Sequence, residues 1–126
     1  MHPKSFFVKS YGCQMNVYDS EKITSILENK GMIEKKEIHY ADVVIFNTCN
    51  IRDKAAHKVY SDIGRVTKLS KNKTIAVVGC VAQAENSEMF HKNNNIDIVL
   101  GPQSYHLLPQ MINDREKNKE KLINTD

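Results

Sequence analysis

The residues with the clearest capacity for chemistry are three cysteines, Cys13, Cys49 and Cys80, in a chain of 126 residues. An odd number excludes a complete internal set of disulfides. The thiols are therefore ligands of a metal or cluster, reactive groups, or inert buried side chains. Thiolates bind zinc and iron–sulfur clusters, so the first question is whether the fold brings the three together.

Each cysteine follows a predicted strand and precedes a predicted helix. Apolar runs predict strands over 5–11, 41–47 and 74–78, and each ends just before one of the three cysteines. In an open α/β sheet these strand-to-helix junctions share the carboxyl edge of the sheet. Free N–H groups at a helix start also favour a thiolate. We therefore expect the cysteines to meet at one site.

The remaining elements fit the same architecture. Further strands are predicted over 32–34 and 96–100, and helical periodicity predicts helices over 17–30, 52–69, 82–90 and about 107–112. Asn16 is the expected cap of the first helix and Gly31 its stop. The order predicts an α/β fold with an open, mostly parallel sheet and helices on both faces, flavodoxin-like or Rossmann-like. Residues 1–112 form the predicted domain, and the polar residues 113–126 a linker or tail toward a further domain.

The number of thiolates separates the candidate metals. Three do not complete a structural zinc site, which takes four ligands. None of the five histidines falls at a strand-to-helix junction with the cysteines. Three thiolates do suit a 4Fe–4S cluster with one open iron. Three inert thiols, a zinc-stabilised interaction domain and a flavodoxin-like binding or regulatory module remain as alternatives.

Several neighbours of the cysteines have side chains that suit a cluster. Hydrogen bonds to cluster sulfides and a compensating positive charge tune such sites, and glycine lets a bulky group approach the backbone. The expected neighbours of the cluster are Gln14, Asn16, Asn47, Thr48, Arg52 and Gly79.

Composition narrows the class of protein. With 40% hydrophobic and 26% charged residues, the chain is neither collagen-like nor wholly disordered. Its apolar runs are too short to cross a bilayer, and no signal-peptide pattern is present, so a cytoplasmic location is expected. A net charge of +3 permits an RNA partner without requiring one. We interpret the loose basic group at Arg65, Lys68, Lys71 and Lys73 as a solvated helix end.

Three sequence motifs around the cysteines resemble one family. They are YGCQMNVYDSE over 11–21, NTCNIRDKA over 47–55 and GCVAQ over 79–83. In this order they are similar to the N-terminal domain of the radical-SAM methylthiotransferases, and the resemblance extends over about residues 4–112. Gln14-Met15 resembles the branch that acts on isopentenylated adenosine next to the anticodon of tRNA. Two other branches usually have Pro-Lys or Lys-Val at those positions.

The resemblance implies a cofactor for this domain and a separate domain that binds further cofactors. The cysteines that match Cys13, Cys49 and Cys80 hold an auxiliary 4Fe–4S cluster in the family, and its open iron takes the sulfur that becomes the methylthio group. A second 4Fe–4S cluster and S-adenosylmethionine belong to a separate barrel, whose C-x-x-x-C-x-x-C motif is absent from this sequence. We therefore expect no catalytic residues in this chain and no turnover by it alone. It is expected to be a monomer that meets tRNA through the full-length enzyme, with an unknown sulfur donor.

Overall fold

The computed structural model describes residues 4–10, 14–48, 53–69, 73–79, 95–101, 104–118 and 122–124. In these residues six strands form one sheet in the order β2-β1-β3-β4-β5-β6, and every neighbouring pair is parallel. The strands are β1 Ser5–Ser10, β2 Ile33–Glu34, β3 Val43–Thr48, β4 Thr74–Gly79, β5 Ile98–Leu100 and β6 Leu122–Asn124. The predicted α/β open parallel sheet is confirmed. The strand order is flavodoxin-like, with its switch point between β1 and β3.

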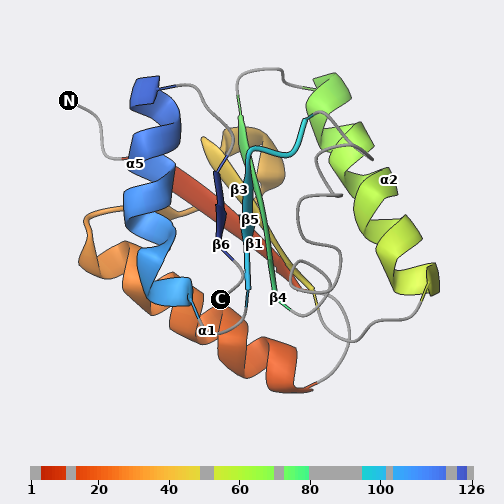
Figure 1. Ribbon diagram of the computed structural model, residues 1–126, viewed down its shortest axis with the longest axis horizontal. Coiled ribbons are helices and arrows are strands. Elements are labelled where there is room, and N and C mark those ends of the chain that lie inside the picture. Colours follow the sequence, from red (N-terminus) through yellow and green to blue (C-terminus); the bar gives the residue numbers. More distant parts are fainter. Residues whose placement is uncertain are drawn as a thin grey trace.

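Helices cover both faces of the sheet. Figure 1 shows α1 and α5 on one face and α2 on the other. Their bounds are α1 Gln14–Asn29, α2 Asp53–Leu69 and α5 Leu108–Asn118, with 3-10 turns η1 Ile38–Tyr40 and η2 Tyr105–Leu107. The helix predicted over 82–90 lies outside the described residues. No helix in the described ranges is long and apolar enough to span a membrane.

The central strands bury side chains on both faces, because successive side chains of a strand point to opposite sides. Val43 and Ile45 pack in the core beneath α1 and α5. Val44 and Phe46 pack with Val59 of α2 in the second core. All six residues of β3 and of β4 are buried. This burial explains why both strands have continuous apolar sequences rather than alternating ones.

The first helix begins earlier than its predicted start. It starts at Gln14, so Asn16 lies inside the helix and its prediction as the N-cap is wrong. Gln14 and Met15 both favour helix, which extends the element toward the N-terminus.

The end of this helix is as predicted. Gly31 has φ +89°, and its amide donates to the Glu28 carbonyl at 3.0 Å. The Met32 amide donates to the Leu27 carbonyl at 3.1 Å, so the two bonds form a Schellman motif.

The polar C-terminal region is more structured than its composition indicates. The last helix continues beyond Ile112 to Asn118, and β6 pairs with β5. Arg115 of α5 binds one oxygen of Asp97 twice, with Nη2 at 2.8 Å and Nε at 3.0 Å from Oδ1. Glu116 pairs with Lys4. Composition alone does not predict contacts between residues this far apart in the sequence. That residues 113–126 lead toward a further domain stays a prediction.

The amino edge of the sheet is closed by polar contacts. The amide of Ser5 donates to Asp42 Oδ2 at 3.1 Å, and the Ser5 hydroxyl lies 3.2 Å from the same oxygen. Lys73 Nζ donates to the carbonyls of His39 and Ala41. Burial lowers the pKa of Lys73, and the nearby charge of Asp42 opposes that shift. Lys73 is therefore part of the framework, unlike the exposed Lys68 with which the sequence groups it.

Candidate functional site

The three cysteines themselves lie outside the described residues, but the strands that lead to them are described. Cys49 directly follows Thr48, the last residue of β3, and Cys80 directly follows Gly79, the last residue of β4. These strands are adjacent, and Thr48 and Gly79 are register partners. The two chain segments that carry Cys49 and Cys80 therefore leave the sheet side by side.

The strand that leads to Cys13 ends at the same edge. β1 neighbours β3, and its last residue, Ser10, is the register partner of Asn47. The carboxyl ends of these strands lie at the lower side of the view in Figure 1. The expectation that the three strand ends share one edge is confirmed, while a common site for the cysteines stays a prediction.

Gly79 is held where no other residue fits. Its φ is +103°, a conformation that L side chains rarely adopt. A Cβ at this position would collide with the carbonyl oxygen of Thr48 and lie 3.0 Å from the Thr48 hydroxyl and 3.3 Å from Asn47 Oδ1. The sequence suggested a glycine that admits a bulky group, and the structure adds a second reason, which is the crowding between β3 and β4.

The hydroxyl of Thr48 also joins these two strands. Its Oγ1 donates to the Val78 carbonyl at 2.7 Å, and the residue is buried. The hydroxyl proton is therefore used within the sheet. This contact fixes the end of β3 against β4 at the point where both chains approach their cysteines.

A polar contact network joins β1, β3 and α1 at this edge. Asn47 is fully buried, and its Nδ2 donates to Ser20 Oγ of α1 at 2.9 Å. The hydroxyl of Ser20 also shares a hydrogen bond with that of Ser10. Buried amides require such partners, because an unpaired one loses its hydration without compensation. Ser20 therefore connects the ends of two strands to the first helix.

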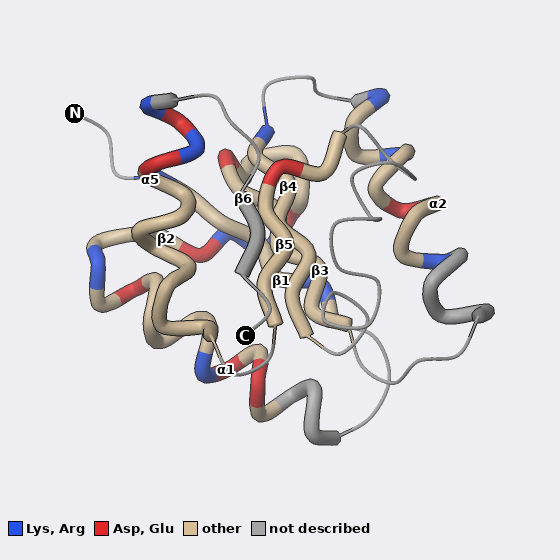
Figure 2. The backbone as a smooth tube through the Cα atoms, viewed as in Figure 1, with Lys and Arg blue, Asp and Glu red and all other residues tan. Residues whose placement is uncertain are grey.

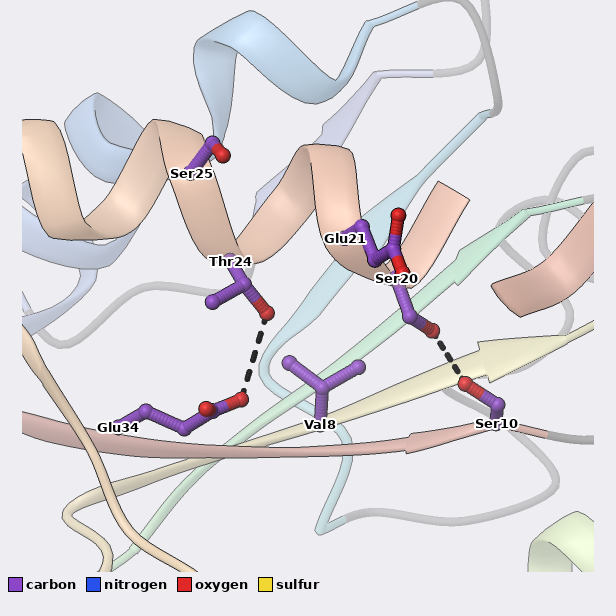
Figure 3. Close-up of a pocket in the computed structure, with 7 residues that line it drawn as sticks. All are labelled: Val8, Ser10, Ser20, Glu21, Thr24, Ser25 and Glu34. Carbon is purple, nitrogen blue, oxygen red and sulfur yellow. Dashed lines mark hydrogen bonds between the residues drawn. The ribbon is translucent and has the colours of Figure 1, made fainter. Parts of the chain in front are cut away.

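A shallow cavity of about 410 Å³ lies beside this network, between α1 and β1. Figure 3 shows the Ser10–Ser20 contact at one end of it and a bond from Thr24 to Glu34 at the other. The lining is formed by Val8, Ser10, Ser20, Glu21, Thr24, Ser25 and Glu34. The cavity is mostly polar and shares two of its residues with the network.

The structure describes only some of the residues of the predicted site. Gln14 and Asn16 lie in the first turns of α1, where the backbone alone is described, and Arg52 lies outside the described residues. Asn47, Thr48 and Gly79 are at the predicted edge. Within the described ranges no group of three His, Cys, Asp or Glu side chains could hold a metal ion, and all three cysteines are outside those ranges.

Sequence reasoning missed Ser10 and Ser20. Ser10 is the final residue of β1 at the carboxyl edge of the sheet, and its place near the end of a predicted strand was a usable signal. Ser20 lies within α1, and its contact with Asn47 spans 27 positions of sequence. Periodicity within one element contains no information on such a pair.

Comparison with known proteins adds the family. Residues 5–101 match the model of the family described as Uncharacterized protein family UPF0004. The chain belongs to this family. The matched stretch of this UPF0004 chain runs from β1 through β5 and includes all three cysteines.

Curated relatives extend the match beyond the family model. This UPF0004 chain is 51% identical over 125 residues to a protein of Ehrlichia ruminantium (strain Gardel) named tRNA-2-methylthio-N(6)-dimethylallyladenosine synthase. Proteins of the same name in Ehrlichia canis (strain Jake) and Roseobacter denitrificans are 49% and 48% identical. Each match covers 98% of this chain but only 28% or 29% of the relative. The similarity to the N-terminal domain of the methylthiotransferases that the motifs predicted is thereby confirmed.

Proposed function

We propose that this chain is the cluster-bearing domain of a tRNA methylthiotransferase, which adds a methylthio group to C2 of isopentenylated adenosine next to the anticodon. Identity near 50% across the chain to proteins named for this reaction carries the proposal. The chain spans about 28% of the length of those relatives. The complete activity therefore belongs to a longer protein, and this portion alone does not turn over.

In this proposal Cys13, Cys49 and Cys80 hold a 4Fe–4S cluster with one open iron. The register of Thr48 with Gly79 supports a shared ligand site. Adjacent strands are about 4.8 Å apart, so the chain segments that carry Cys49 and Cys80 start from neighbouring positions at the ends of β3 and β4. Three thiolates are the donor set that such a cluster takes.

The residues around the strand ends have supporting roles in this proposal. When bound, the cluster supplies an iron that can take an external sulfur ligand. Gly79 and Thr48 hold the ends of β4 and β3 together, and Asn47 anchors β3 to α1. Gln14, Asn16 and Arg52 are further candidates for contact with the cluster.

The rest of the proposed enzyme rests on the resemblance of the three cysteine motifs to the methylthiotransferases. A second 4Fe–4S cluster and S-adenosylmethionine are bound elsewhere in the full-length protein, which recognises tRNA and works in the cytoplasm. The portion described by this sequence is proposed to be a monomer. The sulfur donor is left open.

Anaerobic reconstitution tests the cluster. Iron, sulfide and zinc are counted for the wild type, for Cys49→Ala and for Ser25→Ala, an exposed serine of α1. We expect about four irons with equal sulfide in the wild type and in Ser25→Ala, and a large loss in Cys49→Ala. Zinc in place of iron would favour a zinc-stabilised interaction domain, bound flavin a flavodoxin-like module, and no metal three inert thiols.

The role in tRNA modification needs the full-length enzyme. Cys49→Ala introduced there should abolish formation of the methylthio nucleoside, as measured by mass spectrometry of digested tRNA. Normal product from this variant would contradict the role of the cysteine. If the methylthio nucleoside made by the unmodified enzyme lacks the isopentenyl group, the assignment to this branch of the family is contradicted.

A further inference from the structure

The segment that carries Cys13 is bracketed by two elements that touch each other. Ser10 ends β1 before this segment, and α1 begins at Gln14 directly after it. The hydrogen bond between the hydroxyls of Ser10 and Ser20 therefore joins the strand before Cys13 to the helix after it. The ends of the segment are fixed relative to each other by one side-chain contact.

The same serine reaches the second cysteine segment. Asn47 is two positions before Cys49, and its buried amide donates to Ser20 Oγ at 2.9 Å. Asn47 also lies close to the end of β4, since a Cβ at Gly79 would stand 3.3 Å from Asn47 Oδ1. Ser20 thus contacts Ser10, which precedes the Cys13 segment, and Asn47, which precedes Cys49. Asn47 in turn lies beside Gly79, the residue before Cys80.

We propose that Ser20 is a positioning residue, which sets the Cys13 segment relative to the Cys49 segment so that both thiolates face one cluster. This inference rests on the proposed function, because the cluster is what the two segments would share. A hydroxyl suits the role since it donates one hydrogen bond and accepts others. An alanine at this position would remove the contacts with Ser10 and Asn47 and leave the backbone of α1 in place.

Two variants isolate the hydroxyl. Ser20→Ala removes it, and Ser20→Thr restores a hydroxyl at the same carbon. Ser25→Ala is the matched control, because Ser25 lies on the same helix and lines the same cavity but is exposed and outside the network. Thermal unfolding of each apo-protein establishes that the variants are folded before any comparison of metal.

The first measurement is retention of the cluster. Reconstituted proteins are challenged with an iron chelator, and the half-life of the cluster absorbance is recorded. Loss of a group that hydrogen-bonds a metal ligand weakens binding by about 10- to 100-fold. Ser20 contacts residues beside the ligands and not the ligands themselves, so we expect the half-life of Ser20→Ala to shorten by about tenfold, at the lower end of that range. Ser20→Thr and Ser25→Ala should retain most of the wild-type half-life. The reduction potential of the cluster should shift in Ser20→Ala alone.

The second measurement needs no metal. In apo-protein that carries Cys80→Ser, a short bifunctional maleimide should join Cys13 to Cys49, and the linked peptide is quantified by mass spectrometry. Addition of Ser20→Ala should reduce the yield several-fold, and addition of Ser25→Ala should not. A folded Ser20→Ala protein with wild-type cross-linking would overturn the inference, as would an equal cluster half-life.

The two measurements separate the inference from the proposed function. If the wild type takes up no iron but cross-linking depends on Ser20, the cluster is contradicted and the positioning role stands. If the wild type holds a cluster that Ser20→Ala retains equally well, the cluster stands and the positioning role is wrong.

Discussion

The two edges of the sheet differ in chemistry. At the amino edge, carboxylates and cations meet, as in the contact of Arg115 with Asp97, and Asp42 binds Ser5. At the carboxyl edge, the described contacts among Ser10, Ser20 and Asn47 are between neutral groups. Figure 2 shows the charged residues chiefly on the helices and at the strand starts, with the ends of β3 and β4 uncharged.

The difference separates structural support from the proposed site. Ion pairs with extra hydrogen bonds fix the amino edge, where the sheet joins the connections from the helices. At the carboxyl edge, neutral hydroxyls and an amide join Ser10, Ser20 and Asn47. An ion pair also lies near this edge, between Lys9 of β1 and Asp62 of α2. Changes at the amino edge should therefore lower stability alone, whereas changes at the carboxyl edge should also weaken the cluster.

The largest effect is expected from Gly79→Ala at the carboxyl edge. Positive φ and a collision with the Thr48 carbonyl act together, so the free energy of unfolding should fall by about 4 kcal/mol. Gly31→Ala is the matched control, since φ is also positive there but no atom lies within 4 Å of the added carbon. Its expected cost is about 1 kcal/mol. Equal losses in urea unfolding would show that crowding at Gly79 is unimportant.

Asp97→Ala tests the amino edge with a slightly smaller effect. Asp97 is 8% exposed, and it binds Arg115 through one oxygen and the Ile75 amide through the other. Removal leaves a partly buried guanidinium without its partner, and unfolding free energy should fall by about 3 kcal/mol. Asp114→Ala, which removes a contact with the exposed Gln110, should change it by less than about 0.5 kcal/mol. The amount of iron per folded molecule should be unchanged in both variants. A loss of iron in Asp97→Ala alone would contradict the proposed difference between the two edges.

Ser5→Ala should have a moderate effect at the same edge. The Ser5 hydroxyl donates to the Tyr40 carbonyl at 3.0 Å and accepts from the Asp42 amide at 3.0 Å. Because these bonds are partly buried, their loss should lower unfolding free energy by about 1.5 kcal/mol. Chemical denaturation of Ser5→Ala, with Ser25→Ala as the control, measures this change in unfolding free energy. A chelator half-life that falls as far as in Ser20→Ala would contradict the assignment of Ser5 to support alone.

The smallest effect is a pH dependence from Lys73. Burial lowers its pKa in the folded protein below the ordinary value of 10.5. The unfolded chain then binds more protons between the lowered pKa and 10.5, so stability should rise with pH in that window. The difference in unfolding free energy between the wild type and Lys73→Met should therefore shift in favour of the wild type as pH rises. A flat or falling difference would contradict the lowered pKa.

Local signals predicted most of the framework. The continuous apolar sequences of β3 and β4 identify strands buried on both faces, and Gly31 marks the end of α1 because it adopts positive φ there. The start of α1 was missed because a cap signal at Asn16 competes with helix propensity in the two residues before it. β6 was missed because Leu122–Asn124 is short and becomes a strand through pairing with β5.

The candidate site, like the framework, was predicted from the sequence only in part. By itself the sequence determined the class of fold, the family motifs and the position of each cysteine after a strand, since these depend on residue types at short spacing. Only the tertiary structure decided that Thr48 lies opposite Gly79, that Asn47 bonds to Ser20 and that Arg115 secures Asp97. Such contacts depend on strand order and register, which arise from the packing of the whole sheet and are not encoded in any single segment.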